Sequence, residues 1–381
     1  MIPKFNGERL KKARIYREMT VAELAGCIGC QRQTLSMYEI SKSQPTDSSV
    51  VKKLSEVLNF PIKYFYEWPA TSLPSTVYFR SLLTTNKKYR NEQIIKMDFI
   101  SQVYDLLQDY VEFPKFEPLY INNETTPEKA AAMLREAWDL GNNPIENIVT
   151  VAEQHGILVT TFTTSTNDVD AFSRLVGTAD NQTYIIAYSS NKTAAARIHF
   201  DVAHELGHIC LHEWSDDIEE LTKDEFKKRE KQANDFASAF LLPADSFKKD
   251  AEAGPQNLSY YKQLKKKWHV SIAAMIRRSK DLGIITPDEY TAFMRMMQRR
   301  GMRKEEPLDD VLLTANPSLL KMAVMLLLQE GVFTPEDFME ELSSQYNLSI
   351  NPEEVEYLLN LPSRTLTSSK IINFSSLQIK K

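Results

Sequence analysis

The sequence predicts a multidomain protein with an all-α N-terminal domain, an α+β central domain and a helical C-terminal region. Its 381 residues suggest two or three domains, at roughly 150 residues per domain. The hydrophobic content of 43% and the charged content of 25% are ordinary for globular proteins. Helical and strand-like patterns also occupy different stretches of the chain, which indicates separate units.

Composition and charge indicate the compartment and the partners to expect. We see no signal-peptide-like stretch at the N-terminus and no run of about 20 apolar residues, so we expect a soluble, cytoplasmic protein without a membrane partner. Three cysteines are too few for a disulfide framework, which favours a reducing compartment, and we expect Cys27 and Cys30 to be small packing residues. Residues 1–69 hold eleven Lys/Arg against seven Asp/Glu, a balance of +4 that leaves −9 elsewhere. The two parts should therefore have different partners.

Residues 1–69 are expected to form a DNA-binding domain. Thr20 and Glu23 form a capping box that begins one helix, Gly26 and Gly29 bracket a tight turn, and a second helix follows over 31–39. Two short helices joined by a turn suit a helix-turn-helix, whose second helix enters the major groove of double-stranded operator DNA. We expect base-edge contacts from Arg32, Gln33 and Met37, and phosphate contacts from Gln31, Ser36 and Lys42.

The stretch from Phe5 to Phe65 resembles the XRE (lambda-repressor-like) helix-turn-helix family, including Glu39 and the later Pro45. It differs from the family after Glu39, where Ile40-Ser41 replaces an Arg/Lys-Gly pair. A homodimer is expected because such units gain affinity from paired half-sites. The alternative is a helical protein-interaction module that does not bind DNA.

The remaining chain divides near 125 and 307. Residues 70–125 read as a helical connector, with one helix over 91–112. Residues 126–307 read as an α+β unit, and residues 308–381 as a region of unknown role that is helical to about Leu361 and ends in a polar tail. The α+β unit is expected to contain helices over 126–138, 145–155, 192–212 and 225–241, and strands over 157–162, 171–176 and 183–188.

A metal-binding motif lies in the third of these helices. His204 and His208 are four residues apart, so their side chains stack on one helix face and can hold one cation. Glu205 follows the first histidine, and in this H-E-x-x-H arrangement it is the base that takes a proton from water acidified by Zn²⁺. The alternative is a pair of hydrogen-bonded core histidines without a metal.

A third protein ligand is needed if one position is to stay open for water. His212 lies about 12 Å along the helix from His204, too far to share an ion bound at about 2.1 Å. Trp214 occupies the position of a metzincin's third ligand, which excludes that class. A carboxylate from a later helix remains: Glu230 and Asn234 are four apart, so one could ligate while the other bonds an imidazole, with Asp235 and Glu225 as weaker candidates.

These residues resemble the ImmA/IrrE zinc metallopeptidase family. The resemblance rests on His204 to His208, the stretch over 230–237, Leu241-Leu242-Pro243 and the stretch over 170–173, and it covers about residues 126–307. It implies a zincin-like, gluzincin-type fold with one Zn²⁺ on His204, His208 and Glu230 and with Glu205 as base. It also implies fusion to an XRE-type unit and a repressor-type protein as substrate.

The sequence therefore favours a transcriptional regulator with a zinc endopeptidase domain. Such a regulator would cleave a repressor at one peptide bond and derepress stress or mobile-element genes. The competing hypothesis is a non-proteolytic DNA-binding regulator whose zinc domain is structural or senses a ligand.

Overall fold

A computed structural model of the chain describes residues 4–68, 77–78, 87–122, 124–163, 171–178, 181–191, 194–212 and 221–367. The chain divides into two compact units. Unit 1 comprises Met1–Thr71, Ile95–Val111 and Leu320–Lys381, and unit 2 comprises Ser72–Ile94 and Glu112–Leu319. Within the described ranges, no helix combines the length and the apolar character that crossing a membrane requires.

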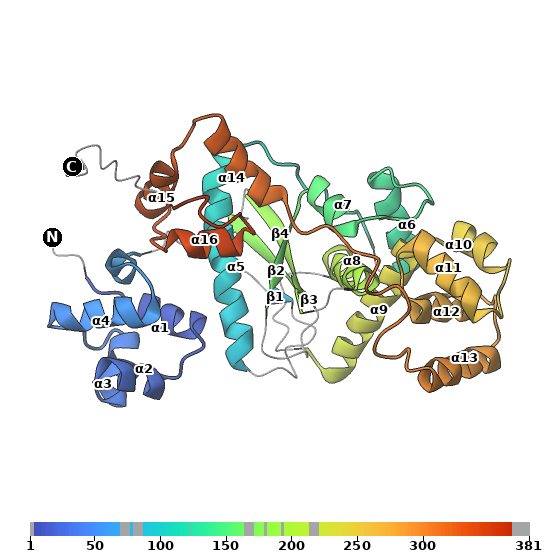
Figure 1. The fold of residues 1–381 in the computed structure, drawn as a ribbon, viewed down its shortest axis with the longest axis horizontal. Coiled ribbons are helices and arrows are strands. Elements are labelled where there is room, and N and C mark those ends of the chain that lie inside the picture. The colour runs from blue at the N-terminus through green and yellow to red at the C-terminus, as the bar shows by residue number, and fades with distance from the viewer. Residues whose placement is uncertain are drawn as a thin grey trace, which may run out of the picture. The chain divides into compact units, whose positions relative to one another are not determined.

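Unit 1 is helical. Figure 1 shows its N-terminal helices in blue and its C-terminal helices in red. Its elements are α1 (Gly7–Tyr16), α2 (Val21–Ile28), α3 (Arg32–Glu39), α4 (Ser48–Leu58), the 3-10 helix η1 (Ile62–Tyr66), the second half of α5 (Lys87–Gln108), α14 (Leu319–Gln329), α15 (Pro335–Ser344) and α16 (Pro352–Leu358).

Helices α2 and α3 follow the local signals in the sequence. Thr20 and Glu23 form the expected capping box at the start of α2. Gly29 ends α2 in the left-handed conformation, at φ 77°, which glycine adopts without steric cost. The expectation that Gly26 also borders the turn is wrong, because α2 continues through it to Ile28. Cys27 is exposed, so the packing role expected of it is also wrong.

The α1 helix is fixed against the end of α3 by charge and by shape. Arg14 bonds both carboxylate oxygens of the buried Glu39, with its Nε 2.5 Å and its Nη2 2.9 Å away. A Cβ built on Gly7 would lie 2.0 Å from the carbonyl oxygen of Tyr38. Only glycine therefore allows this close approach of the two backbones.

The C-terminal segment belongs to the same unit as these helices. Glu354 accepts hydrogen bonds from Arg17 and from Tyr16, each 2.6 Å long, and the backbone N–H of Ser349 donates to the buried Glu67 at 3.1 Å. Residues 308–318 contain no helix, so the helical expectation after Pro307 is wrong for that stretch. Helix α14 is buried along one side only. Met322, on another side of the helix, is 64% exposed.

Unit 2 contains the sheet and the helices that cover it. Its elements are β1 (Val77–Tyr78), α6 (Pro127–Ala137), α7 (Ile148–Gln154), β2 (Ile157–Phe162), β3 (Ala171–Thr178), β4 (Asn181–Ser189), α8 (Ala195–Leu211), α9 (Lys223–Leu241), α10 (Ala244–Ala251), α11 (Leu258–Trp268), α12 (Ile272–Asp281) and α13 (Pro287–Arg299). A small sheet within a mainly helical unit makes this an α+β domain, as the sequence predicts.

The sheet has the order β1-β3-β4-β2. Strands β3 and β4 are antiparallel, whereas β2 runs parallel to β4 and pairs Ile157 with Tyr184. The predicted strand over 157–162 matches β2, and the other two predicted strands lie inside β3 and β4. The two-residue strand β1 was not anticipated, because alternation cannot be detected over two residues.

Helix α8 occupies the centre of unit 2. It contacts β3 and β4 of the sheet as well as α6, α7 and α9, and Figure 1 shows it beside α9. Its own apolar side chains are buried, including Val202 and Leu206, neither of which is exposed. A helix buried in this way can hold polar side chains only if each has partners.

Candidate metal centre

The candidate centre begins on the buried face of α8. His204 and Glu205 are each 1% exposed, and His208 is fully buried. The Nε2 atoms of the two histidines lie 3.0 Å apart, and their ring centroids are separated by 4.7 Å. The four-residue spacing therefore places both Nε2 atoms at one point beside the helix.

Helix α9 brings a carboxylate to the same point. Glu230 Oε1 lies 3.3 Å from His208 Nε2, and Glu230 Oε2 lies 3.7 Å from His204 Nε2. The close approach of the helices depends on Gly207, because a Cβ there would lie 3.0 Å from Ala233 Cα. The glycine between the two histidines thus helps to bring Glu230 within reach of both.

These three side chains fit a metal ion. Their donor atoms all lie within 4.8 Å of one another, and among the described residues they form the cluster suited to an ion. Ligands of a tetrahedral zinc ion at about 2.1 Å are about 3.4 Å apart. The two Nε2 atoms are 3.0 Å apart, and each lies near that distance from one oxygen of Glu230, His208 at 3.3 Å from Oε1 and His204 at 3.7 Å from Oε2. Two imidazole nitrogens and a carboxylate oxygen are also a common donor set for zinc.

Asn234 orients His204. Its Nδ2 donates to the carbonyl oxygen of Glu230 at 2.8 Å, so its Oδ1 faces Nδ1 of His204 at 3.2 Å. An amide oxygen can only accept, and Nδ1 of His204 therefore carries the hydrogen. The Nε2 lone pair of His204 then points into the cluster, as metal binding requires.

Glu205 has a hydrogen-bond partner on the sheet. Its Oε2 accepts a 2.5 Å hydrogen bond from Oγ of Ser173, which is fully buried on β3. The hydroxyl fixes one oxygen of the carboxylate by a charge-assisted bond across 32 positions of sequence. Sequence reasoning missed Ser173, although a lone serine between the apolar Phe172 and the rest of a buried strand is a signal that could have found it.

The other candidates from the sequence have different partners. Asp235 forms a 2.5 Å ion pair with Lys231, and Glu225 caps the start of α9 by accepting from Thr222. His212 Nδ1 lies 3.0 Å from His208 Nδ1. His212 therefore contacts one ring nitrogen of His208, and Glu230 contacts the other, Nε2. Burial, and to a smaller degree the neighbouring His208, lowers the pKa of His212 to about 3.

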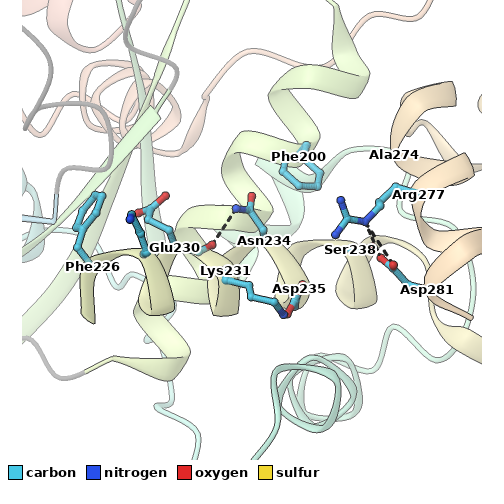
Figure 2. A pocket seen from close by; sticks show the side chains of 11 residues that line it. Phe200, Phe226, Glu230, Lys231, Asn234, Asp235, Ser238, Ala274, Arg277 and Asp281 are labelled. Atoms are coloured by element: carbon cyan, nitrogen blue, oxygen red, sulfur yellow. Dashed lines mark hydrogen bonds and ion pairs between the residues drawn. The ribbon is translucent and has the colours of Figure 1, made fainter. Parts of the chain in front are cut away.

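A pocket of about 450 Å³ adjoins the centre, with Glu230 and Asn234 in its wall. Phe200 of α8 and Phe226 of α9 supply aromatic surface, and Figure 2 shows Glu230 and Asn234 between them. Arg277 completes the wall from α12, where its Nε lies 3.1 Å from Asp281. The pocket could accept part of a ligand next to the cluster.

The residues expected to contact DNA lie on α3 and next to its two ends. All of them are at least partly accessible: Gln31, Arg32, Gln33, Ser36 and Lys42 are exposed, and Met37 is half-buried. The side chain of Gln31 does not cap α3. By contrast, Leu35 on the same helix is fully buried.

Comparison with known families gives one match in this region. Residues 152–280 match the family Peptidase_M78, described as an IrrE N-terminal-like domain. The matched segment is about a third of the chain and contains the three cluster residues together with Glu205 and Asn234. It supports a metallopeptidase-type activity in general. A search of curated proteins gives no match to the chain.

Proposed function

We propose that the chain is a transcriptional regulator with a zinc-dependent endopeptidase domain. It would cleave a repressor-type protein at a specific peptide bond and so derepress stress or mobile-element genes. The observation that carries the proposal is the convergence of His204, His208 and Glu230 beside a buried Glu205, in a segment that matches a peptidase family.

Each residue has a role in this proposal. His204, His208 and Glu230 hold the ion, and Asn234 orients His204. Zinc bound there supplies Lewis-acid polarisation of water and of the peptide carbonyl. The Glu205 carboxylate takes a proton from the attacking water and returns it to the departing amine. Ser173 keeps one oxygen of that carboxylate in place.

The number of ligands favours catalysis over a structural role. Structural zinc sites have four protein ligands, whereas catalytic sites have three and leave one position for water or substrate. The cluster found among the described residues has three members. This is the argument for preferring a peptidase to a regulator whose zinc domain is structural or senses a ligand.

The test combines metal analysis with mass spectrometry of candidate repressors. Wild type should bind one zinc per chain and cut a repressor at one site, whereas Glu205→Gln should keep zinc and lose cleavage by a factor of about 100 or more. Glu136→Gln, an exposed change on α6 of the same unit, is the matched control and should cut normally. Equal cleavage by wild type and Glu205→Gln would refute the peptidase. Zinc binding without cleavage of any repressor would favour the non-proteolytic regulator.

We further propose that α2 and α3 form the helix-turn-helix of an XRE-type domain that binds operator DNA, as a homodimer and in the cytoplasm. The exposure of Arg32 and Gln33 at the start of α3, a helix that buries Leu35, supports this assignment. Arg can bond guanine and Gln can bond adenine through two hydrogen bonds.

Binding-site selection tests the DNA contacts. Arg32→Ala should cost about 1–3 kcal/mol and relax the preference at one base position, because the arginine reads a base edge. Lys42→Ala should weaken binding to all sequences alike and reduce the salt dependence, because the lysine contacts phosphate. An unchanged motif with Arg32→Ala would show that α3 does not read the operator in this register.

A further inference from the structure

His212 and Gln232 form a short chain of side chains behind His208. His212 follows the last residue of α8, and its Nδ1 lies 3.0 Å from Nδ1 of His208. Its other ring nitrogen, Nε2, lies 3.3 Å from Oε1 of Gln232 on α9. His212 therefore contacts a cluster residue directly, and Gln232 contacts it through His212.

The hydrogen atoms of this chain can be assigned in order. The amide oxygen of Gln232 can only accept, so Nε2 of His212 donates to it. The neutral ring of His212 then has a bare Nδ1, which accepts from Nδ1 of His208. Because Nδ1 of His208 carries its hydrogen, Nε2 of His208 presents a lone pair to Glu230 and the cluster.

The reverse assignment would prevent metal binding. If Nε2 of His212 accepted a hydrogen, its Nδ1 would donate to His208, and the hydrogen of His208 would move to the nitrogen that faces the cluster. The acceptor at the end of the chain therefore determines which nitrogen of His208 is available to a cation.

The same orientation is reached more directly at His204. There the amide oxygen of Asn234 accepts from Nδ1 without an intervening ring. Helix α9 thus provides the acceptor for His204 in Asn234 and the acceptor for His212 in Gln232, in addition to the carboxylate of Glu230.

We propose that His212 and Gln232 are positioning residues, which hold His208 in the tautomer that binds zinc and thereby raise the affinity of the centre. The inference rests on the proposed metal centre. It concerns metal affinity, so it can be tested without knowing the protein substrate.

The test is zinc affinity of the full chain, measured by competition with a chromophoric chelator. Gln232→Met, similar in length but without an amide oxygen, should weaken zinc binding by about 10–100-fold, the usual cost of losing such a partner. Gln232→Glu, which can only accept, should bind zinc as tightly as wild type or more tightly. Gln298→Met, an exposed change on α13, is the matched control and should have no effect.

A double-mutant cycle distinguishes the hydrogen-bonded His212–Gln232 pair from two side chains that each support helix packing independently. His212→Leu should weaken zinc binding as much as Gln232→Met does, and the double variant should lose nothing further, because Gln232 acts through His212. Additive losses would overturn the inference, and so would wild-type affinity in Gln232→Met. If wild type itself bound no zinc, the metal centre would be refuted and this inference with it. If Gln232→Met does not fold, the Gln232→Glu variant decides the question. Weaker zinc binding by Gln232→Glu than by wild type would contradict the inference.

Discussion

At the residue scale, the site depends on how buried polar atoms are paired. Glu205 and His204 are neighbours in sequence, yet they bond to different elements, Ser173 on β3 and Asn234 on α9. Asn234 leaves Nε2 of His204 facing the cluster, and Ser173 fixes Oε2 of Glu205. Orientation by buried hydrogen bonds is the usual way in which proteins fix reactive groups.

The Ser173 hydroxyl gives a prediction that separates orientation from metal binding. Ser173→Ala should leave the zinc content unchanged but lower the cleavage rate about tenfold or more, because the carboxylate of Glu205 loses the bond that fixes it. Cleavage of the repressor identified with wild type, measured beside zinc content, checks this.

The control for this change is Ser279→Ala. Ser279 is equally buried in unit 2 and bonds Tyr261 at 2.8 Å, away from the cluster residues in sequence. It should lose stability without a change in cleavage rate. A Ser173→Ala enzyme as fast as wild type would show that the hydroxyl only fills space.

Local spacing explains which site residues the sequence could predict. His204, Glu205 and His208 lie within one and a half helical turns, so their arrangement follows from helix geometry alone. Ser173 and Gln232 come from other elements, and their contacts depend on the packing of a strand and of a second helix. His212 could be excluded as a ligand by distance, but its contact with His208 depends on ring orientation.

At the element scale, the centre depends on the approach of α8 to α9. Gly207 permits this approach, since its added Cβ would meet both the backbone of Ala233 and, at 3.2 Å, Cβ of Phe236. Backbone atoms cannot rotate away, so a side chain there would move one helix relative to the other.

Gly207→Ala should therefore reduce zinc affinity about tenfold, an order-of-magnitude expectation for a displaced ligand. The substitution also gains up to about 1 kcal/mol of helix propensity, so unfolding measurements alone would understate the effect. Chelator competition provides the readout.

Gly26→Ala is the matched comparison. Gly26 lies within α2, and an added Cβ there meets nothing within 4 Å. This change should stabilise unit 1 and leave zinc affinity as it is. Equal zinc affinity in wild type and Gly207→Ala would mean that the two helices tolerate a wider spacing.

Elements with strong local signals were predictable and short or irregular ones were not. The helices over 195–211 and 223–241 lie close to their predicted ranges because apolar spacing marks both and Pro243 follows the second. The sequence gives no reason for β2 to pair with β4 in parallel, since pairing is decided by contacts between distant segments. Residues 308–318 are not helical, although Leu308, Val311, Leu312 and Ala315 have helical spacing.

At the scale of the whole molecule, the metal cluster lies entirely in unit 2. Removal of zinc should therefore raise hydrogen exchange in α8 and α9. Zinc at about 100 times its dissociation constant stabilises by about 2.7 kcal/mol, which corresponds to about a hundredfold change in exchange governed by opening of this unit.

Hydrogen exchange with mass spectrometry, before and after chelation, measures this effect. Peptides from α1 to α4 contain no cluster residue and should keep their protection. A Glu230→Gln variant should resemble the chelated protein with or without added zinc. Unchanged exchange in α8 after chelation would contradict a metal centre at this position.

The sequence could not predict that distant segments of the chain join to form unit 1. Its bonds between Arg17 and Glu354 and between Glu67 and Ser349 join positions 337 and 282 residues apart. No periodicity in either segment indicates the other, so the C-terminal region could only be described as helical.

The discontinuity of unit 1 also has a consequence during translation. The stretch over 112–319 leaves the ribosome as one uninterrupted piece, whereas the N-terminal helices must wait for Glu354 and the buried Leu366 before their unit is complete. Nascent chains halted near residue 320 would therefore hold nearly all of unit 2 and an unfinished unit 1. The candidate peptidase domain can therefore complete its fold during synthesis before the unit that contains the candidate DNA-binding helices.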